Sequence, residues 1–387
     1  MKTLNLFVCA ALLAQSVPVL ADPGVSDKEI VIGSCSAQSG PAEQLGTKQI
    51  LGAKAYLDKV NAAGGVHGRK IKLVVEDDKY EPESAVVCFK KLVDAGVFAA
   101  AFFVGTPTAA KHAPMAEAAK LPIVGLFTGA GLLRDPFKRY VINVRASYGV
   151  ETQVQVDHLW NDLGMKKFGV IYQDDAFGVA VLEGVKKALK THNAEPVAIG
   201  SFQRNTTNVD AAVDQVKAAK PDAVVIVGPY KPVAQVLKAS HGKSWTPQFT
   251  TVSFVGTESL IGEAGADADG MIITQVVPPY NRKDLATVAA YLKDLAKSAP
   301  AEKPSFTSLE GYVDAMVLVE GLKRAGKELT REGLVDSIES LKDFTLGLGS
   351  IKLDYGSKDH AGFKDVFPTV IKGGEAKAFT DWTKLKS

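Results

Sequence analysis

The stretch Phe102–Gly131, FFVGTPTAAKHAPMAEAAKLPIVGLFTGAG, decides the fold of this chain. One apolar run, Val97–Val104, ends just inside it, and a second short apolar run, Pro122–Leu126, follows a helical segment. Strand, helix and strand in this order predict two parallel neighbours in one sheet. Each predicted strand is followed by a turn that carries hydroxyl groups.

The two hydroxyl-bearing turns predict a ligand site. Thr106 and Thr108 follow the first strand, and Thr128 with Gly129 follows the second. In an open parallel sheet, ligands bind in the crevice outside the carboxyl ends of the strands. A hydroxyl beside the free N–H groups of a helix start suits an anion such as a carboxylate. A simpler interpretation, in which Thr106 or Thr108 only caps the helix, stays open.

Residues 1–21 have the pattern of a secretory signal peptide. Lys2 supplies a positive charge, Leu6–Leu13 an apolar middle, and Val19-Leu20-Ala21 a cleavage site before Asp22. The mature chain is therefore expected in the periplasm. No later stretch predicts a membrane span.

Composition excludes several classes of function. The 387 residues include 45 Lys or Arg and 43 Asp or Glu, and this balance, without a basic stripe, argues against nucleic-acid binding. The six histidines and the cysteines show no metal-ligand spacing, so neither a metal nor another cofactor is expected. Cys35 and Cys88 remain after signal removal, and Cys88 lies on a predicted helix that should pack beside the first strand. A disulfide between them is one expectation, and two separate buried thiols are the other.

Apolar runs alternate with amphipathic helical patterns in two consecutive series of similar length, which predicts two lobes with parallel sheets and helices on both faces. The last hundred residues add helices and then strands, so the chain is expected to cross between the lobes and form a hinge. The expected strands are Glu29–Gly33, Lys70–Glu76, Phe168–Tyr172, Val197–Phe202, Ala223–Val227, Phe249–Val252, Ile351–Tyr355 and Val366–Ile371. The expected helices are Gln44–Ala62, Glu81–Ala95, Phe177–Lys190, Asn208–Ala219, Pro232–Ser240, Asp284–Lys297, Ser308–Ala325 and Thr330–Leu341.

Enzymatic classes fit the sequence poorly. No turn carries the Gly-x-Gly-x-x-Gly pattern of nicotinamide binding, and GTPTAAK lacks the spacing of a phosphate-binding loop. No Gly-x-Ser-x-Gly elbow is present, and the adjacent acids Asp174 and Asp175 are not expected to face one reacting centre. A non-enzymatic role is therefore expected.

Seven segments, in their order and spacing, resemble the periplasmic solute-binding proteins of ABC transporters, in the leucine/isoleucine/valine-binding family. They are IVIGSCSAQSGPAEQLG (Ile30–Gly46), NAAGGVHGRKIKLVVEDDKYEPESA (Asn61–Ala85), VGTPTAA (Val104–Ala110), VGLFTGAG (Val124–Gly131), VRASYGVET (Val144–Thr152), IYQDDAFG (Ile171–Gly178) and SLEGYVDAMVLVEGLKRAG (Ser308–Gly326). The resemblance implies an α/β fold with two Rossmann-like lobes, the type I periplasmic binding protein architecture, joined by a three-crossover hinge. It places residues 22–145 with about 278–360 in the first lobe, and 146–277 with about 361–387 in the second.

The resemblance also implies a monomer that encloses one small-molecule ligand between its lobes and passes it to an ABC transporter permease. Thr106, Thr108, Thr128 and Gly129 match the loops that hold the ligand carboxylate. Leu45 stands where an aromatic side chain commonly covers the ligand. The other positions carried over to the ligand site are Tyr148, Phe177, Tyr230 and Ser253.

Ser253 departs from the family, whose amino-acid binders usually place there a Glu that pairs with the ligand ammonium. Asp174, Asp175 and Glu258 are candidate substitutes, although each also fits a helix start or a surface acid. The expected ligand is a small carboxylate, an amino acid of the branched-chain or a related type. The alternatives are an aromatic or aliphatic carboxylate or amide, or a sensory protein that feeds a receptor.

Overall fold

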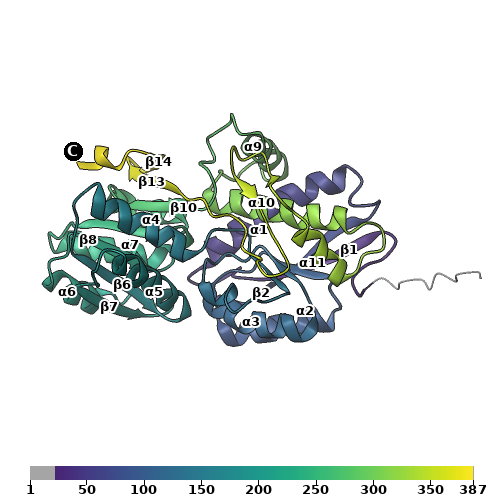
Figure 1. The fold of residues 1–387 in the computed structure, drawn as a ribbon, viewed down its shortest axis with the longest axis horizontal. Coiled ribbons are helices and arrows are strands. Elements are labelled where there is room, and N and C mark those ends of the chain that lie inside the picture. Colours follow the sequence, from purple (N-terminus) through teal and green to yellow (C-terminus); the bar gives the residue numbers. More distant parts are fainter. Residues whose placement is uncertain (1–21, 387) are drawn as a thin grey trace, which may run out of the picture.

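The computed structural model describes residues 22–386, which form two α/β lobes lying side by side (Figure 1). The predicted signal peptide, residues 1–21, lies outside the described residues. Each lobe is built around one sheet, and this confirms the two-lobed α/β fold that the alternating pattern predicts. Between residues 22 and 386, no helix is long and apolar enough to cross a membrane.

The N-lobe is the part built around a five-stranded parallel sheet in the order β2-β1-β3-β4-β5. Its strands are β1 (Glu29–Ser36), β2 (Lys70–Asp77), β3 (Ala99–Ala101), β4 (Ile123–Val124) and β5 (Val141–Ile142), with a separate pair, β11 (Phe344–Thr345) and β12 (Lys352–Leu353). Its helices are α1 (Glu43–Ala62), α2 (Pro82–Asp94), α3 (Thr106–Ala119), α9 (Ala286–Ser298), α10 (Phe306–Arg324) and α11 (Arg331–Glu339). Helix α1 packs on α9 and α10, and α2 packs on α3.

The C-lobe is the part built around a seven-stranded sheet in the order β14-β13-β10-β9-β8-β6-β7. Its strands are β6 (Phe168–Asp174), β7 (Ala198–Gln203), β8 (Ala223–Val227), β9 (Gln248–Val252), β10 (Ile272–Gln275), β13 (Phe367–Lys372) and β14 (Glu375–Ala378). Its helices are α4 (Tyr148–Asn161), α5 (Ala176–Lys190), α6 (Asp210–Ala218), α7 (Tyr230–Gly242) and α8 (Thr257–Ala264). Strands β13 and β14 are antiparallel and come from the end of the chain.

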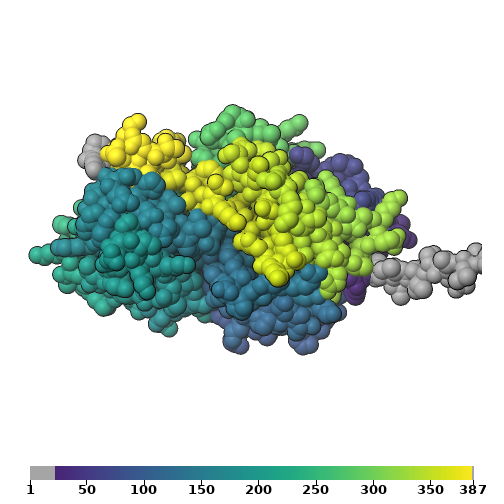
Figure 2. Space-filling model, in the orientation of Figure 1, coloured from purple at the N-terminus to yellow at the C-terminus, as the bar shows by residue number. Residues whose placement is uncertain are grey.

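The chain passes between the two sheets in three segments, 143–147, 276–285 and 354–366. Figure 2 shows the last of these, in yellow, running over the surface from one lobe to the other. Three crossings make the hinge that the family resemblance implies. The apolar core of the C-lobe also continues into N-lobe side chains, among them Leu45, Tyr80 and Phe127, so the lobes meet through buried contacts.

Helices α1 and α10 approach each other closely through two glycines. A Cβ atom added at Gly52 would lie 1.7 Å from the carbonyl oxygen of Ser308, and one added at Gly311 would lie 2.0 Å from that of Gln49. Any side chain at either position would collide with backbone. This contact brings α10, which follows the second crossing, against the first helix of the chain.

Several predicted elements differ from the observed ones. The predicted strand Val97–Val104 is a regular strand only at Ala99–Ala101, because Phe102 adopts a left-handed backbone with φ 63° and turns the chain, and Val104 forms an isolated bridge beyond it. Helix α7 begins at Tyr230, two residues before the predicted start, because Pro229 supplies an extended N-cap and Pro232 is tolerated in the first turn. Helix α4 and strands β5 and β10 were not predicted, since their short or mixed patterns give a weak periodic signal.

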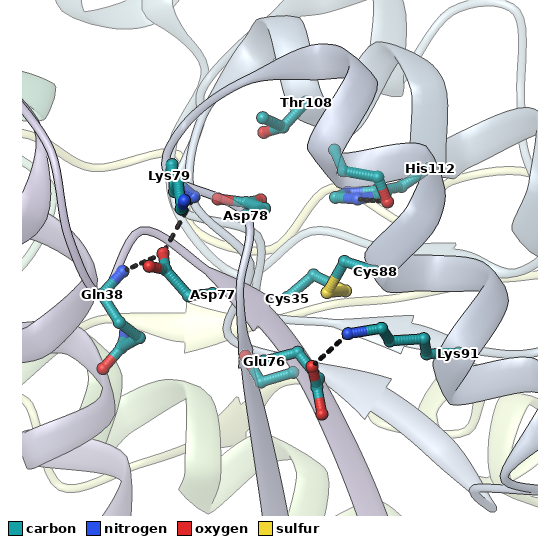
Figure 3. The surroundings of a disulfide bond; sticks show 12 residues. Cys35, Gln38, Glu76, Asp77, Asp78, Lys79, Cys88, Lys91, Thr108 and His112 are labelled. Carbon is teal, nitrogen blue, oxygen red and sulfur yellow. Dashed lines mark hydrogen bonds and ion pairs between the residues drawn. A yellow bond between two sulfur atoms is a disulfide. The ribbon is translucent and has the colours of Figure 1, made fainter.

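Cys35 and Cys88 form a disulfide that joins the end of β1 to α2, with their Cα atoms 6.0 Å apart (Figure 3). Both residues are buried in the N-lobe core. Cys35 stands one residue before the end of β1, and Cys88 lies in the helix that follows the turn after β2. The bridge therefore ties the carboxyl end of β1 to the helix that follows β2.

Replacing both cysteines, as Cys35→Ser with Cys88→Ser, should lower the free energy of unfolding by about 2–4 kcal/mol, because the bridge closes a long loop in the unfolded chain. Urea unfolding of the mature chain, followed by tryptophan fluorescence, measures the change. Reducing the wild-type protein should lower its stability by a similar amount and leave the double variant unaffected. Two free thiols in the native protein from an oxidising compartment would contradict the bridge.

Candidate functional site

The two hydroxyl-bearing turns lie side by side at the carboxyl ends of β3 and β4. Val104 pairs with Phe127 in a parallel bridge beyond the strands, and the N–H of Gly105 donates to the carbonyl of Phe127 at 3.2 Å. This pairing brings the hydroxyl oxygens of Thr106 and Thr128 to 2.6 Å from each other. Both side chains are fully buried. Thr106 does not cap α3, because Gly105 occupies the N-cap position and no side chain bonds there.

Thr108 differs from Thr106 although it lies on the same turn. Its hydroxyl donates back to the carbonyls of Val104, at 2.5 Å, and Gly105, at 3.1 Å. A hydroxyl has one hydrogen, so Thr108 can offer a ligand only its acceptor lone pairs. A carboxylate needs donors, and Thr106 and Thr128 are the better placed of the three.

Tyr148 packs against the second turn at the start of α4. Its N–H donates to the carbonyl of Gly129 at 2.8 Å, and a Cβ atom on Gly129 would lie 2.7 Å from its ring. Its phenol is buried and has no hydrogen-bond partner. Burial raises the pKa of Tyr148 to about 12, although the positive charge of Arg145 opposes that rise. A neutral, unpartnered phenol beside Thr128 is a further donor for an anion.

Aromatic rings from both lobes surround these turns. Phe254, in the C-lobe, lies with its ring centroid 5.5 Å from that of Phe127 and 6.1 Å from that of Tyr80, both in the N-lobe. Within the C-lobe, Phe177 lies 4.4 Å from Phe254 and 5.3 Å from Tyr148. All five side chains are at most 1% exposed. Such surroundings suit the apolar part of a small ligand.

Ser253 lies beside a buried ionic cluster. Arg145, 1% exposed, donates from Nη2 to the Ser253 hydroxyl, and its guanidinium lies over the Phe127 ring at 4.6 Å. The Glu151 carboxylate accepts the Ser253 N–H at 2.8 Å and the Ser253 hydroxyl at 3.0 Å, and it lies 3.9 Å from Arg145. Burial raises the pKa of Glu151, and Arg145 opposes that rise. The carboxylate of Glu151 therefore reaches the Ser253 position, and the guanidinium of Arg145 lies there with it.

Two further acids extend this cluster into the N-lobe. Glu310 of α10 lies 3.4 Å from Nε of Arg145, and Asp314, one turn further along, accepts from Gln49 at 3.2 Å. Both acids are buried, and each has one oxygen without a hydrogen-bond partner. Burial raises the pKa of Glu310 to about 8 and that of Asp314 to about 7, and the attraction of Arg145 lowers both. Arg145 thus joins carboxylates of both lobes through the first crossing segment.

Leu45 and Tyr230 lie on another side of the lobe boundary. A Cβ atom on Gly256 would lie 2.5 Å from the Leu45 side chain, so Leu45 reaches across to the C-lobe. Tyr230 is 2% exposed, its phenol has no hydrogen-bond partner, and it lines a groove of about 560 Å³ together with Gln44 and Glu258. The structure does not bring Tyr230 against the rings around Phe254.

The three candidate substitute acids have other partners. Asp174 is exposed, and Asp175 caps α5 by accepting the N–H groups of Phe177 and Gly178. Glu258 accepts the N–H of Phe306 at 3.2 Å, at the first residue of α10. Burial raises the pKa of Glu258 to about 7. Each acid serves a helix start or the surface, and none of the three lies beside Ser253 as Glu151 does.

The residues that sequence reasoning missed are Tyr80, Arg145, Glu151 and Phe254. Arg145 and Glu151 stand in the segment VRASYGVET, where a charge follows an apolar run and a Glu follows Tyr148 at i+3 on one helix face. The sequence therefore contained a signal for Arg145 and Glu151 that could have placed both at the site. Among residues 22–386, no group of three or more His, Cys, Asp or Glu is arranged to hold a metal ion.

Two α/β lobes that enclose a hydroxyl pair and aromatic rings define a periplasmic binding protein of type I. The family model described as "Periplasmic binding protein" matches residues 29–376. The chain belongs to this family, in its leucine/isoleucine/valine-binding class, and this confirms the resemblance seen in the sequence.

Two relatives illustrate the relationship. A Leu/Ile/Val-binding protein of Rhizobium johnstonii is 26% identical over 354 residues, which cover 89% of this chain and 92% of that protein. A leucine-specific-binding protein of Salmonella typhimurium is 23% identical over 355 residues, which cover 87% and 95%. Both relatives are named as solute-binding proteins, not as enzymes.

Solved structures agree with the fold. The structure of a possible leucine/isoleucine/valine-binding protein of Rhodopirellula baltica has a TM-score of 0.89 and 32% identity, and the match covers 96% of this chain and all of that one. LivJ of Streptococcus pneumoniae, in complex with isoleucine, has a TM-score of 0.78 and 22% identity, with 91% and 98% covered. At this identity LivJ shares the fold, and its ligand is a property of LivJ.

The buried acids predict how stability changes with pH. Above about pH 4.5 the unfolded chain has released the protons of Glu310 and Asp314, while the folded chain holds that of Asp314 up to its pKa of about 7 and that of Glu310 up to its pKa of about 8. Since the folded state then binds more protons, their contribution to the free energy of unfolding falls as the pH rises, by at most about 1.4 kcal/mol per pH unit for each group.

Asp314→Asn and Glu310→Gln should each flatten this dependence, because neither amide titrates. Urea unfolding at a series of pH values measures the slope. Asp94→Asn, a change at an exposed surface acid, is the matched control and should keep the wild-type slope. Equal slopes in the wild type and both buried variants would contradict the assignment.

Proposed function

We propose that the mature protein binds one small carboxylate-bearing solute between its lobes and delivers it to an ABC transporter permease, without chemistry on the solute. The observation that carries this proposal is the buried hydroxyl pair of Thr106 and Thr128, with the unpartnered phenol of Tyr148 beside it. Once the two hydroxyls exchange their mutual hydrogen bond for the ligand, they and the phenol supply three donors at the carboxyl ends of parallel strands, which suits a carboxylate. The names of the relatives support the same class of ligand.

An amino acid with an apolar side chain is the first candidate ligand. The rings of Phe127, Phe177 and Phe254 offer apolar contacts, and Glu151 places a carboxylate at Ser253, where an ammonium group would be held. The branched-chain amino acids of the relatives fit this description. The protein would then be a periplasmic binding component of an amino-acid importer.

A carboxylate without an ammonium group is the second candidate, and Arg145 favours it. The guanidinium already sits at Ser253 and faces Glu151, so a ligand ammonium there would meet a buried positive charge. Nη1 of Arg145 has no hydrogen-bond partner, so it could donate to a carbonyl or an anionic group of the ligand instead. The two candidate ligand classes differ in whether the group that faces Ser253 is an ammonium.

Calorimetric titration with matched pairs of compounds tests the proposal. L-leucine is compared with 4-methylpentanoate, which lacks only the amino group, and L-phenylalanine with 3-phenylpropanoate. One member of a pair should bind at a ratio of 1:1, and the amino-acid proposal predicts that it is the one with the ammonium group. Conversion of a bound compound into a product would contradict a pure binding function.

Thr106→Val and Thr128→Val should each weaken the binding of the carboxylate about 10- to 150-fold, because each removes a hydroxyl that bonds a charged group while nearly keeping the volume. Thr108→Val, on the same turn, is the matched control. Its hydroxyl hydrogen serves the carbonyls of its own chain, so its loss should change affinity much less. Dissociation constants from the same titration measure all three. Equal losses in all three variants would refute this division of roles.

A further inference from the structure

The turn after β2 reaches from the N-lobe to the C-lobe and carries Tyr80 to the site. The Tyr80 side chain is fully buried, and its phenol lies 3.5 Å from the amide nitrogen of Gln173 in the C-lobe. A Cβ atom on Gly105 would lie 2.1 Å from the Tyr80 ring, so the ring rests on the residue that precedes Thr106. Tyr80 therefore adjoins both the anion-binding turn and Phe254.

Bonds within the N-lobe fix this turn. The Asp77 carboxylate accepts the N–H groups of Gln38 and Lys79, each at 2.9 Å (Figure 3), and Asp78 accepts the N–H of Tyr80 at 2.9 Å. Lys79 and Tyr80 adopt left-handed backbone conformations, with φ 55° and 60°. This conformation is strained for any residue other than Gly, so the turn persists because the hydrogen bonds around it hold it in place.

The C-lobe grips the same turn from the opposite side. Arg204, just after β7, donates from Nη1 to the carbonyl of Tyr80 at 2.8 Å, and its guanidinium also binds the Glu81 carboxylate. The amide of Asn205 donates to the second oxygen of Glu81. The Arg204 guanidinium lies 5.9 Å from the centre of the Tyr80 ring. These contacts join the lobes beside Tyr80, at residues far along the chain from the three crossing segments.

The surroundings of this contact place it at an opening between the lobes. Asn205 and Gln173 line a groove of about 660 Å³ together with Gly40 and Glu43 of the N-lobe and Lys231 of the C-lobe. Arg204 is partly exposed, with 21% of its side chain accessible, and Glu81 has 40%. Their attraction is therefore open to screening by salt.

We propose that Arg204 is a positioning residue that grips Tyr80 and Glu81, holds the lobes closed and keeps the Tyr80 ring over the ligand site. Opening the lobes would withdraw Arg204, Gln173 and Phe254 from Tyr80 together, because all three belong to the C-lobe. This inference rests on the proposed ligand-binding function for its purpose. Its mechanism, a latch between two named segments, does not depend on the identity of the ligand.

Single-molecule Förster resonance energy transfer in the ligand-free mature chain tests this latch, the contact of Arg204 with Tyr80 and Glu81. Dyes at Asp94→Cys and Asp214→Cys, two exposed positions, report on α2 and α6, the helices that follow the two latch segments. We expect a closed population in the wild type. Arg204→Gln and Glu81→Gln should each lower the ratio of closed to open molecules about tenfold, and the double variant should lower it by less than the product of the two single effects, because both changes remove the same ion pair.

Conservative and control variants separate positioning from folding. Arg204→Lys keeps the positive charge but loses the planar guanidinium with its several N–H donors. Its closed population should therefore lie between those of the wild type and Arg204→Gln. Glu83→Gln changes an exposed acid of α2 that pairs with Lys111 in the same lobe, and it should leave the closed population unchanged. Added salt should lower the closed population of the wild type and not that of the double variant. Melting temperatures should change little in all of them.

The latch is overturned if the wild type shows no closed population, if Arg204→Gln leaves the population unchanged, or if the two single effects simply add. These outcomes differ from failure of the proposed function. A latch that behaves as expected in a protein that binds no carboxylate would refute the function alone. Carboxylate binding with no effect of Arg204 on closure would refute the latch alone.

Discussion

Arg145 carries a positive charge into the interior between the two lobes, and the rest of the site depends on how that charge is satisfied. The side chain is 1% exposed, and an isolated buried charge costs several kcal/mol. Its partners come from both sides, with Glu310 in the N-lobe and Ser253 with Glu151 in the C-lobe. Because Arg145 lies in the first crossing segment, these partners fix how the lobes meet near the hinge.

The site combines this ionic cluster with two less polar features. Thr106 and Thr128 supply hydroxyls because the pairing of Val104 with Phe127 holds their turns in register. The aromatic rings supply an apolar wall made from both lobes, so the wall is complete only when the lobes are closed. Closure is thus favoured near the hinge by Arg145 and, beside the groove lined by Gln173 and Asn205, by the proposed latch.

The sequence predicts the layout of this protein better than its chemistry. Strong alternation of apolar runs and helices predicts the two sheets, and the positions of Thr106 and Thr128 after neighbouring strands predict that they meet. The sequence pattern could not show that the Thr108 hydroxyl bonds to backbone carbonyls of its own turn. Thr106 and Thr108 are the same residue type on one turn, and only the direction of each side chain separates their roles. Nor could the pattern show that Glu151 lies against Ser253, because that contact joins residues about 100 positions apart and depends on how α4 packs on β9 and β10.

The measurement that tests the central claim most directly is a crystal structure of the mature protein with the compound that binds most tightly in the calorimetric titration. The account predicts density for a carboxylate between the hydroxyls of Thr106 and Thr128, within hydrogen-bonding distance of both and of the Tyr148 phenol, with the apolar part of the compound against Phe254. A compound bound instead in the groove lined by Gln44, Tyr230 and Glu258, with the threonine pair still bonded to each other, would contradict it.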